Sequence, residues 1–562
     1  MNGLAPLPAD PGPITRHGCR VGGRWLHYRR LGAGPPVLLL HQTPQSSQTL
    51  EPLMRLLAPH ATALAVDTPG FGLSEPLPGE DWGMADLADA MAGFLDALGI
   101  GPVAVCGQHT GASIGAELAL RHPGRVSALA LDGLPLFTAE EAQSILPHQL
   151  YRFQPQPEGT HLMWAWSRFR DGWLFFPWSQ RDRAHRRVLD LPGPELIHRM
   201  QVMELLRSRE SHLRVYPGVF AWPGAQVVAA LPLPVWTGTT ADDQLFPHLQ
   251  RLPALPPGSR VEPLPAGARA QVLQAQARWV LARLPAADAP PSPPALAHWA
   301  GPDGCGRAFA EGLSVHGLGL GRPGPARVLL HGAGGSARCE LRRWQQAAGD
   351  GEPAGPVLAM DLPGHGDSGG RVLEPAAAAR PLAAALAALG WREIEVHARG
   401  YGAAVAVEWA LQAAPADAPT PALPCRPRAL HLSELAARGA DERARWRECY
   451  ATPIEPAWDG SHLVRLWHEV RDRELFHPWF ERSRANIRPV EPRLDAETLT
   501  QAVFAALCCE DWVRAHTAWL EWDPAGPRGV AAARAAGLPV HLHAVPGDGW
   551  AQGLERLQGV PG

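Results

Sequence analysis

The sequence predicts an α/β fold built twice, as two domains that each place helices on both faces of a mostly parallel sheet. Three observations support this prediction. Apolar segments of strand length alternate with segments of helix length through residues 36–132, and the alternation returns after residue 327. In each half a strand runs directly into a helix through a glycine-containing turn, at residues 103–120 and 394–411. Residues 285–294 are rich in proline and alanine, which is typical of a linker.

The first half predicts a hairpin followed by alternating strands and helices. Because buried parallel strands read as short apolar runs, each run bounded by polar or glycine residues is assigned as a strand. Residues 134–222 interrupt the alternation with a helical segment rich in tryptophan and phenylalanine. We expect a hairpin at 19–31 and strands at 36–41, 62–66, 128–132, 233–238 and 260–264, with a further strand that begins at Val103. Helices are expected at 50–57, 84–98, 111–121 and 271–284.

The second half repeats the pattern of the first. A strand at 327–331 ends in His331-Gly332, and the strand-to-helix turn follows at 394–411. Residues 161–187 and 462–488 align without a gap, with histidine, tryptophan, Arg-Asp and Pro-Trp matches at a constant separation. This repetition indicates a duplication. The matched segments either contact each other or bind related ligands, or they reflect only a recent duplication.

Two motifs resemble those of the α/β-hydrolases. Residues 107–111, Gly-Gln-His-Thr-Gly, resemble the nucleophile elbow, a sharp turn that lifts one side chain above the sheet. Residues 67–74 and 361–368 share the pattern D-x-P-G-x-G-x-S, which resembles the loop after the fourth strand of that fold. The resemblance implies two tandem α/β-hydrolase domains, at 1–284 with a helical cap at about 134–225 and at 295–562 with a cap at about 435–520.

The resemblance also implies a site around the elbow of domain 1. The lifted residue there is His109, where a serine is usual. The backbone N–H groups of Thr110 and Thr43 are expected to form the oxyanion hole. The acid is expected at Asp243, and His41 on the neighbouring strand end is a candidate to share or relay a proton. Asp242 and Asp132 occupy alternative positions for the acid.

Neither half contains the complete set of residues that the serine mechanism requires. The histidine of the family should follow Leu264, but residues 265–271 contain none. In the second half the lifted residue is Gly400, which has no side chain, so we expect no catalysis there. The end of the chain can be aligned in two ways. In the first alignment, residues 538–543 match 233–238, which places Asp548 at the acid position and leaves the last strand absent. In the second, residues 545–552 match 264–271, which places Gly549 or Trp550 at the position of the histidine.

Three functions therefore remain open from the sequence, the third being a non-catalytic subunit of an active hydrolase encoded elsewhere. In the first, domain 1 is a divergent hydrolase that acts on a small apolar carbonyl compound (an ester, a thioester or a C–C bond beside a carbonyl), with His109 as general base or transient acyl acceptor. In the second, the chain is a catalytically inactive pseudo-hydrolase that binds a ligand or a protein partner, and His109 only fills space.

Composition excludes several other functions. The formal net charge is −4, which gives no reason to expect nucleic acid or membrane partners. All 51 basic residues are arginine, so Schiff-base chemistry and a P-loop lysine are absent. We find no apolar signal segment and no apolar run that could span a bilayer, and expect a cytoplasmic protein without cofactor. His541 and His543 share a strand face, but no third ligand is evident, so no metal site is predicted. Whether the chain forms a homo-oligomer is left open.

Overall fold

The computed structural model describes residues 12–284, 299–301, 303–348, 354–413, 423–435 and 438–543. The chain divides into two units. Unit 1 contains residues 1–154 and 163–294, and unit 2 contains residues 155–162 and 295–562. The predicted linker at 285–294 lies outside the described residues.

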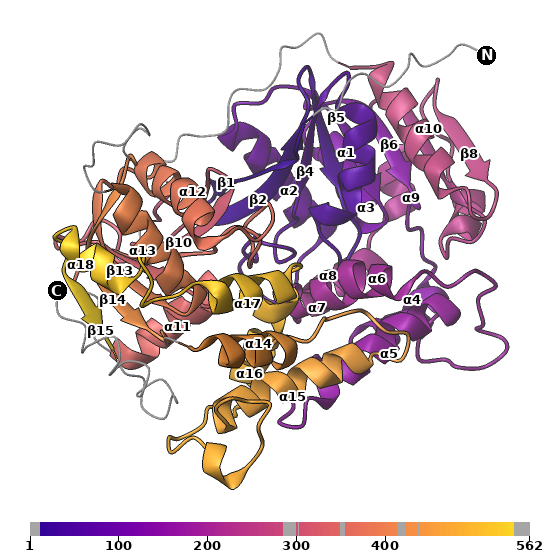
Figure 1. Cartoon of the computed structure of the whole chain (residues 1–562). Coiled ribbons are helices and arrows are strands. Elements are labelled where there is room, and N and C mark those ends of the chain that lie inside the picture. Colours follow the sequence, from indigo (N-terminus) through magenta and orange to yellow (C-terminus); the bar gives the residue numbers. More distant parts are fainter. Residues whose placement is uncertain are drawn as a thin grey trace. The chain divides into compact units, whose positions relative to one another are not determined.

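Unit 1 contains an eight-stranded sheet with the order β1-β2-β4-β3-β5-β6-β7-β8 (Figure 1). The β1–β2 hairpin is antiparallel and joins β4 in antiparallel register, while every later pairing is parallel. All residues of β3 and β4 are buried, as expected for central parallel strands. The strands are β1 (Thr15–Val21), β2 (Arg24–Leu31), β3 (Pro36–Leu40), β4 (Thr62–Val66), β5 (Val103–Gln108), β6 (Val126–Asp132), β7 (Val235–Thr240) and β8 (Arg260–Leu264).

Two apolar layers enclose this sheet. One layer packs α2 (Met84–Ala97) and α3 (Thr110–Arg121) on one face, and the other packs α1 (Glu51–Leu57) and α10 (Arg269–Leu281) on the opposite face. The segment between β6 and β7 forms the predicted helical insertion. Its helices are α4 (Ala139–Gln149), α5 (Thr160–Leu174), α6 (Pro194–Ile197), α7 (Met203–Ser208), α8 (Ser211–Phe220) and α9 (Gly224–Ala229).

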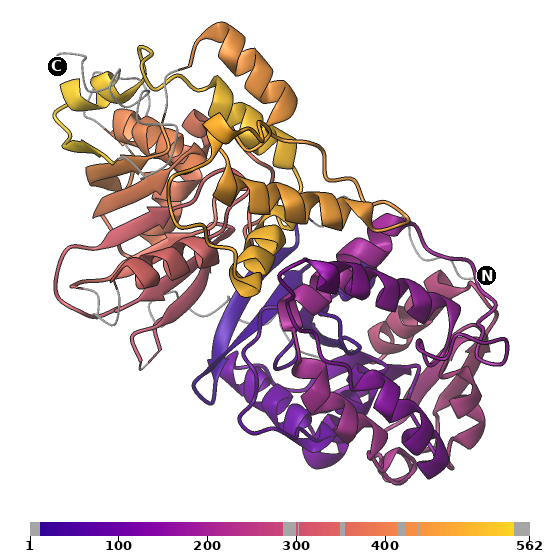
Figure 2. The ribbon, with the colours of Figure 1, turned by 90° about the horizontal axis from the view of Figure 1, so that it is seen from below.

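Unit 2 contains a seven-stranded sheet with the order β15-β14-β13-β11-β12-β10-β9, and these strands lie side by side in Figure 2. Read from β9, this order repeats that of unit 1 up to the seventh strand. The strands are β9 (Gly306–Ala310), β10 (Leu313–Leu318), β11 (Arg327–Leu330), β12 (Val357–Met360), β13 (Glu393–Arg399), β14 (Arg426–Ser433) and β15 (Val540–Leu542).

The helices of unit 2 follow the same plan. Helices α12 and α13 contribute buried residues to the main core of the unit, and α14 to α17 belong to the inserted segment. The helices are α11 (Ala337–Ala348), α12 (Pro375–Ala388), α13 (Tyr401–Ala413), α14 (Ala440–Cys449), α15 (Ser461–Leu475), α16 (Ala496–Leu507), α17 (Trp512–Glu521) and α18 (Val530–Ala535).

The predicted fold class, two α/β domains with mostly parallel sheets, is confirmed by these two sheets. The strand β15 pairs in parallel with β14, just as β7 pairs with β6, which supports the first of the two alignments of the chain end. Asp548, the acid of that alignment, lies outside the described residues. Among the helices that the structure describes, none is both long and apolar enough to cross a bilayer.

Candidate active site

The turn between β5 and α3 holds His109 in a backbone conformation that L-residues rarely adopt. Its φ is 47° and its ψ is −113°, and the residue directly precedes the first residue of α3. Such a conformation costs on the order of 1–3 kcal/mol and persists only where the surroundings impose it. Here the backbone N–H of His109 donates to the carbonyl oxygen of Asp132 at 2.8 Å, which ties the turn to the end of β6.

Two glycines explain why the strand and the helix can approach so closely. A Cβ atom on Gly107 would lie 2.3 Å from the carbonyl oxygen of Gly111. A Cβ atom on Gly111 would lie 2.3 Å from the carbonyl oxygen of Leu40 on the neighbouring strand. Since backbone atoms cannot move away as a flexible side chain can, only glycine fits at these two positions. The turn therefore presents one side chain, that of His109.

That side chain pairs with Asp243. Its Nε2 lies 2.9 Å from Asp243 Oδ2, and the backbone N–H of Leu245 donates to the other carboxylate oxygen at 2.7 Å. The two side chains are only 18% and 17% exposed. Because Asp243 accepts at Nε2, the neutral imidazole carries its proton there and keeps a lone pair on Nδ1. Among the described residues Nδ1 has no hydrogen-bond partner.

The charges of this pair are coupled. Burial by itself lowers the pKa of His109, but the carboxylate of Asp243, helped by Asp132, outweighs burial and raises that pKa above its usual value. Burial opposes ionisation of Asp243, yet the attraction and hydrogen bond of His109 outweigh this effect and lower the pKa of Asp243 to about 2. The carboxylate is thus ionised throughout the neutral range, and the pKa of the imidazole lies above its usual value.

A second pair lies beside the first. Arg269 forms an ion pair with Asp132, whose side chain is fully buried, while the arginine is about half exposed. Arg269 follows β8, within the stretch where a histidine was expected. The acid position at the end of β6 is therefore occupied, but its partner is a permanent cation rather than an imidazole that could move a proton.

The cap of unit 1 adds a further cation. Arg187 donates to the carbonyl oxygens of Asp242 at 2.9 Å and of Gly172 at 3.1 Å. Burial lowers the pKa of this arginine, while the nearby carboxylates of Asp243 and Asp242 act in the opposite direction. His248 also interacts electrostatically with His109 and Asp243, and burial lowers its pKa to about 4, so it is neutral at pH 7.

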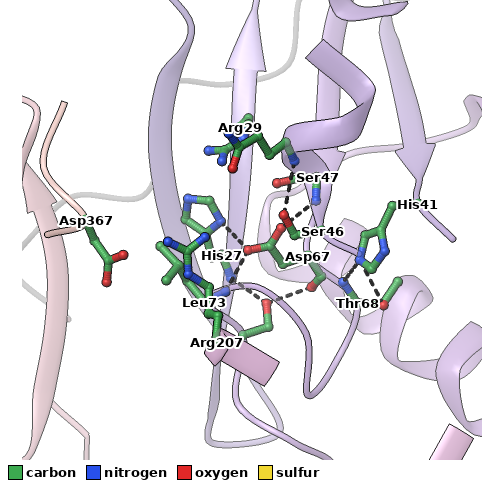
Figure 3. Close-up of polar contacts among 12 residues, drawn as sticks. His27, Arg29, His41, Ser46, Ser47, Asp67, Thr68, Leu73, Arg207 and Asp367 are labelled. Carbon is green, nitrogen blue, oxygen red and sulfur yellow. Dashed lines mark hydrogen bonds and ion pairs between the residues drawn. The ribbon is translucent and has the colours of Figure 1, made fainter. Parts of the chain in front are cut away.

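His41 lies in a different set of contacts (Figure 3). Its Nδ1 is 2.9 Å from the carbonyl oxygen of Gln42, and its Nε2 accepts from the backbone N–H of Thr68 at 3.0 Å. Both ring nitrogens are thus occupied in joining β3 to the loop after β4, and the structure shows no hydrogen bond between His41 and His109. Unit 2 repeats this arrangement, since His331 contacts Gly332 and accepts from Leu362. A relay through His41 stays a prediction.

The loop after β4 is itself fixed by Asp67 (Figure 3). This buried carboxylate accepts from the backbone N–H groups of Ser47 and Leu73 and pairs with His27 Nδ1, each at 2.8 Å. Burial opposes its ionisation, but His27 and Arg29 outweigh burial, so the pKa of Asp67 lies well below its usual value. Asp67 thus holds the loop after β4 in place, and these partners do not include His109 or Asp243.

The expected oxyanion donors lie at the correct ends of their elements. Thr110 is the first residue of α3, where the backbone N–H has no acceptor within the helix. Thr43 follows β3, and its carbonyl oxygen accepts from the hydroxyl of Tyr216 at 3.3 Å. Their joint role as an oxyanion hole stays a prediction.

Unit 2 fills the corresponding space differently. Gly400 has a φ of 51°, close to that of His109, so the bend of the elbow is retained. A Cβ atom there would lie 3.5 Å from Glu434 Oε2. The other oxygen of Glu434 accepts from Arg399 at 2.7 Å, and Arg399 also donates to Glu340 at 2.7 Å. An ion-pair network therefore stands at the elbow of unit 2.

Sequence reasoning missed three residues of the site in unit 1. Arg269 could have been found, because it follows β8 where the histidine was expected. Arg187 also had a signal, since it is the last residue of the cap segment that repeats in unit 2. His248 had none, because an isolated histidine in a short turn after β7 carries no pattern.

Comparison with known families concerns the fold of unit 1. A model of the alpha/beta hydrolase fold matches residues 35–255, less than half of the chain. Unit 1 has the α/β-hydrolase fold. The matched region runs from the start of β3 to beyond β7 and so includes the elbow, Asp132 and Asp243.

Curated relatives of this hydrolase fold are themselves hydrolases. The chain is 32% identical over 126 residues to the 2-(acetamidomethylene)succinate hydrolase of Mesorhizobium japonicum, covering 22% of this chain and 45% of that protein. It is 32% identical over 134 residues to the bifunctional epoxide hydrolase 2 of Rattus norvegicus, covering 23% and 24%. It is 33% identical over 108 residues to the haloalkane dehalogenase of Agrobacterium fabrum, covering 19% and 35%. The alignments thus span less than half the length of each relative.

Two solved structures are similar to part of this chain. The epoxide hydrolase A of Mycobacterium thermoresistibile is 20% identical with a TM-score of 0.39, covering 48% of this chain and 98% of that one. A malate-bound thermophilic esterase of Thermogutta terrifontis is 19% identical with a TM-score of 0.37, covering 49% and 100%.

Proposed function

We propose that unit 1 is a hydrolase of small carbonyl compounds in which His109 acts as a general base. The observation that carries this proposal is the pairing of His109 with Asp243 at the elbow. A buried carboxylate fixes the tautomer and orientation of the ring, and a lone pair on Nδ1 remains to accept a proton. Such a dyad needs no separate serine, because water can serve as the nucleophile.

The reaction would proceed in two steps. His109 Nδ1 takes a proton from a water molecule while the water oxygen attacks the carbonyl carbon, and the carbonyl oxygen becomes an oxyanion beside the N–H groups of Thr110 and Thr43. The tetrahedral intermediate then collapses and expels the alcohol, thiol or carbon leaving group, which takes the proton back from His109. Asp243 stays ionised in both steps and stabilises the imidazolium between them.

Unit 2 is assigned no catalytic role in this proposal. Gly400 offers no side chain at the elbow, and the carboxylate of Glu434 beside it is neutralised by Arg399. The retained bend and sheet fit a duplicated domain that stabilises or binds rather than reacts.

The decisive experiment compares turnover of chromogenic esters, thioesters and lactones by the wild type, His109→Ala and Asp243→Asn. We expect His109→Ala to lose at least 100-fold in kcat, the usual size of a general-base contribution, and Asp243→Asn to lose a smaller part. His60→Ala, an exposed histidine of unit 1, is the matched control and should retain full activity. Equal rates in the wild type and His109→Ala would remove His109 from catalysis.

A second candidate, a ligand-binding pseudo-hydrolase, is favoured by the pairing of Asp132 with Arg269. This pair places a permanent cation where a catalytic imidazole would move protons. Ligand-induced thermal stabilisation without turnover of any compound in the panel would support this second function. Turnover that vanishes with His109→Ala would reject it.

A further inference from the structure

Four histidines gather on one face of the sheet of unit 2, away from its elbow. His397 on β13, His431 on β14 and His541 on β15 occupy successive registered positions across three parallel strands. His543 lies two residues beyond His541, and alternate residues of an extended chain face the same side. We call these four residues the histidine ladder.

The rings of the ladder are in contact. The ring centroids of His397 and His431 are 4.4 Å apart, and those of His431 and His541 are 4.8 Å apart. His543 joins from the side, with its centroid 5.3 Å from that of His431 and its Nε2 3.1 Å from His431 Nδ1. His431 is therefore the centre of the cluster, because it touches each of the other three rings.

We propose that the histidine ladder binds a divalent transition-metal ion such as Zn²⁺ through His431, His541 and His543. Neutral imidazole is a preferred ligand of such ions, and Zn–N bonds are about 2.0–2.1 Å long. Two nitrogens bound to one tetrahedral ion therefore lie roughly 3.3 Å apart. The 3.1 Å between His431 Nδ1 and His543 Nε2 is close to this spacing. The ring of His541 is stacked on that of His431 with centroids 4.8 Å apart, so His541 must reorient to become the third ligand.

The protonation state of the ladder suits this role. Burial lowers the pKa of His431, and the neighbouring His541 and His543 lower it further. Burial lowers the pKa of His397 to about 3, again with His431 and Arg327 adding to the effect. Both rings are thus neutral at pH 7. In the metal-free state one of the two facing nitrogens, His431 Nδ1 or His543 Nε2, carries the proton of their hydrogen bond. When both nitrogens bind the ion, that proton moves to the other nitrogen of the ring that carried it.

A positive charge near the ladder is neutralised by a carboxylate, so it does not oppose binding of a cation. Arg327 on β11 faces the same side, but it forms an ion pair with Glu395 at 3.3 Å. Trp344 covers the inner end of the ladder, edge-on to His397 with centroids 5.0 Å apart. His397 Nε2 is buried without a hydrogen-bond partner among the described residues. His397 thus supports the inner side of His431 by stacking and is not itself one of the proposed ligands.

The fold does not require histidines at these positions. In unit 1 the corresponding registered row is Cys106, Ala130 and Trp236, which is buried beneath α10 and belongs to the apolar core. Each row begins three residues before its elbow residue, at Cys106 before His109 and at His397 before Gly400. The same sheet position is therefore filled by apolar packing in one unit and by stacked imidazoles in the other.

Another group of potential ligands in unit 2 fits a cation less well. His316, Asp361 and Asp367 place ligand atoms within 4.8 Å of one another. However, Asp367 pairs with Arg307 at 2.9 Å and with Arg338 at 3.4 Å. These guanidinium groups already neutralise the carboxylate and repel a metal ion, so the histidine ladder is the better site.

The proposal is tested by equilibrium dialysis of the full chain, freed of metal with a chelator, against Zn²⁺ at pH 7.5. We expect one ion per chain at micromolar Zn²⁺, and at least tenfold weaker binding in His431→Ala. His543→Ala should weaken binding similarly. His468→Ala, an exposed histidine elsewhere in unit 2, is the matched control and should bind as the wild type does.

A second readout separates ligation from loss of fold. Co²⁺ bound by imidazoles absorbs in the visible region, and this band should disappear in His431→Ala while the circular dichroism spectrum is unchanged. Binding that is equal in His431→Ala and wild type, or absent from the wild type at 100 µM Zn²⁺ (roughly a hundred times the expected concentration), would overturn the proposal. Ester turnover plays no part in this test, so its outcome is independent of the function proposed for unit 1.

Discussion

His109 and Asp243 are hydrogen-bonded at 2.9 Å although 134 residues separate them in the chain. The carboxylate after β7 thus contacts the lifted side chain of the elbow directly. In a triad an imidazole would stand between these two positions. Here the lifted residue is itself the imidazole. The stretch after β8, where the histidine of a triad was expected, contains Arg269, and this arginine pairs with Asp132. The site therefore consists of two separate ion pairs rather than one chain of three residues.

The first prediction concerns the titration of His109. Because Asp243 stabilises the imidazolium, the pKa of His109 in the wild type should exceed 6.5. In Asp243→Asn this attraction is lost while burial remains, so the pKa should fall relative to the wild type. Measurement of the His109 ring signals by NMR between pH 4 and pH 9 gives both values without any substrate. An unchanged pKa in Asp243→Asn would contradict the coupling of the pair.

The same pair predicts how stability depends on pH. A raised pKa of His109 contributes stability that is present below the unfolded value near 6.5 and is lost as pH rises through the folded value. The lowered pKa of Asp243, about 2, contributes stability above the unfolded value near 3.8 that is lost as pH falls towards 2. The thermal midpoint of wild type relative to Asp243→Asn should therefore be highest at about pH 4–6 and decrease on either side. A difference that does not vary with pH would exclude this linkage.

The second prediction concerns Asp132 and Arg269. Arg269→Ala leaves a fully buried carboxylate without its cation, which should cost about 2–3 kcal/mol, less than for a wholly buried pair because the arginine is half exposed. Asp132→Asn in the same background should recover part of this loss. A double-mutant cycle on denaturant unfolding measures the coupling, and a value near zero would show that the pair does not stabilise the site.

Much of this arrangement could be predicted from local sequence. The bend at His109 followed from glycines spaced around it, because their Cβ atoms would meet backbone oxygens. Strands β3 and β4 were evident because central parallel strands are apolar throughout. These features depend on residues that are close together in the chain, so a short motif carries them.

The contacts that decide the chemistry depend on residues far apart in the chain. The sequence left three candidates for the acid position, Asp243, Asp242 and Asp132. The structure shows that Asp243, in the loop after β7, is the one that contacts His109. The third imidazole beside His541 and His543 was not evident, because His431 lies on a neighbouring strand more than a hundred residues earlier. Strand pairing brings such residues together, and no local pattern reports it.

The third prediction compares His41 with His331. Each ring accepts a backbone N–H from the loop after the fourth strand of its unit, at 3.0 Å. Replacing either by alanine leaves that N–H unsatisfied and should cost about 1–3 kcal/mol in unfolding free energy. Because both nitrogens of His41 are occupied, we expect kcat to remain within about threefold of wild type in His41→Ala. A larger fall in kcat at unchanged stability would instead support a relay through His41.

The fourth prediction concerns the cap arginines. Arg187 interacts with Asp243 and Asp242 beside the elbow of unit 1, whereas Arg488, its repeat in unit 2, interacts with Glu434. If unit 1 carries the activity, Arg187→Ala should raise KM about tenfold for substrates that bear a carboxylate, and should leave neutral esters nearly unchanged. Arg488→Ala is the matched control and should alter neither. Equal changes in both variants would point to a general effect on the caps.

The fifth prediction tests whether unit 2 retains a working elbow geometry. At Gly400 the nearest atoms to an added Cβ are 3.5 Å away, and His109 shows that a side chain is tolerated at a φ near 50°. Gly400→Ala should therefore fold and cost only the local strain, on the order of 1–2 kcal/mol. At Gly402 an added Cβ would lie 2.5 Å from the carbonyl oxygen of His331, so Gly402→Ala must separate α13 from β11 and should destabilise the chain much more. Thermal unfolding of the two variants measures this contrast, and a similar loss in both would mean that the bend at Gly400 depends on glycine itself.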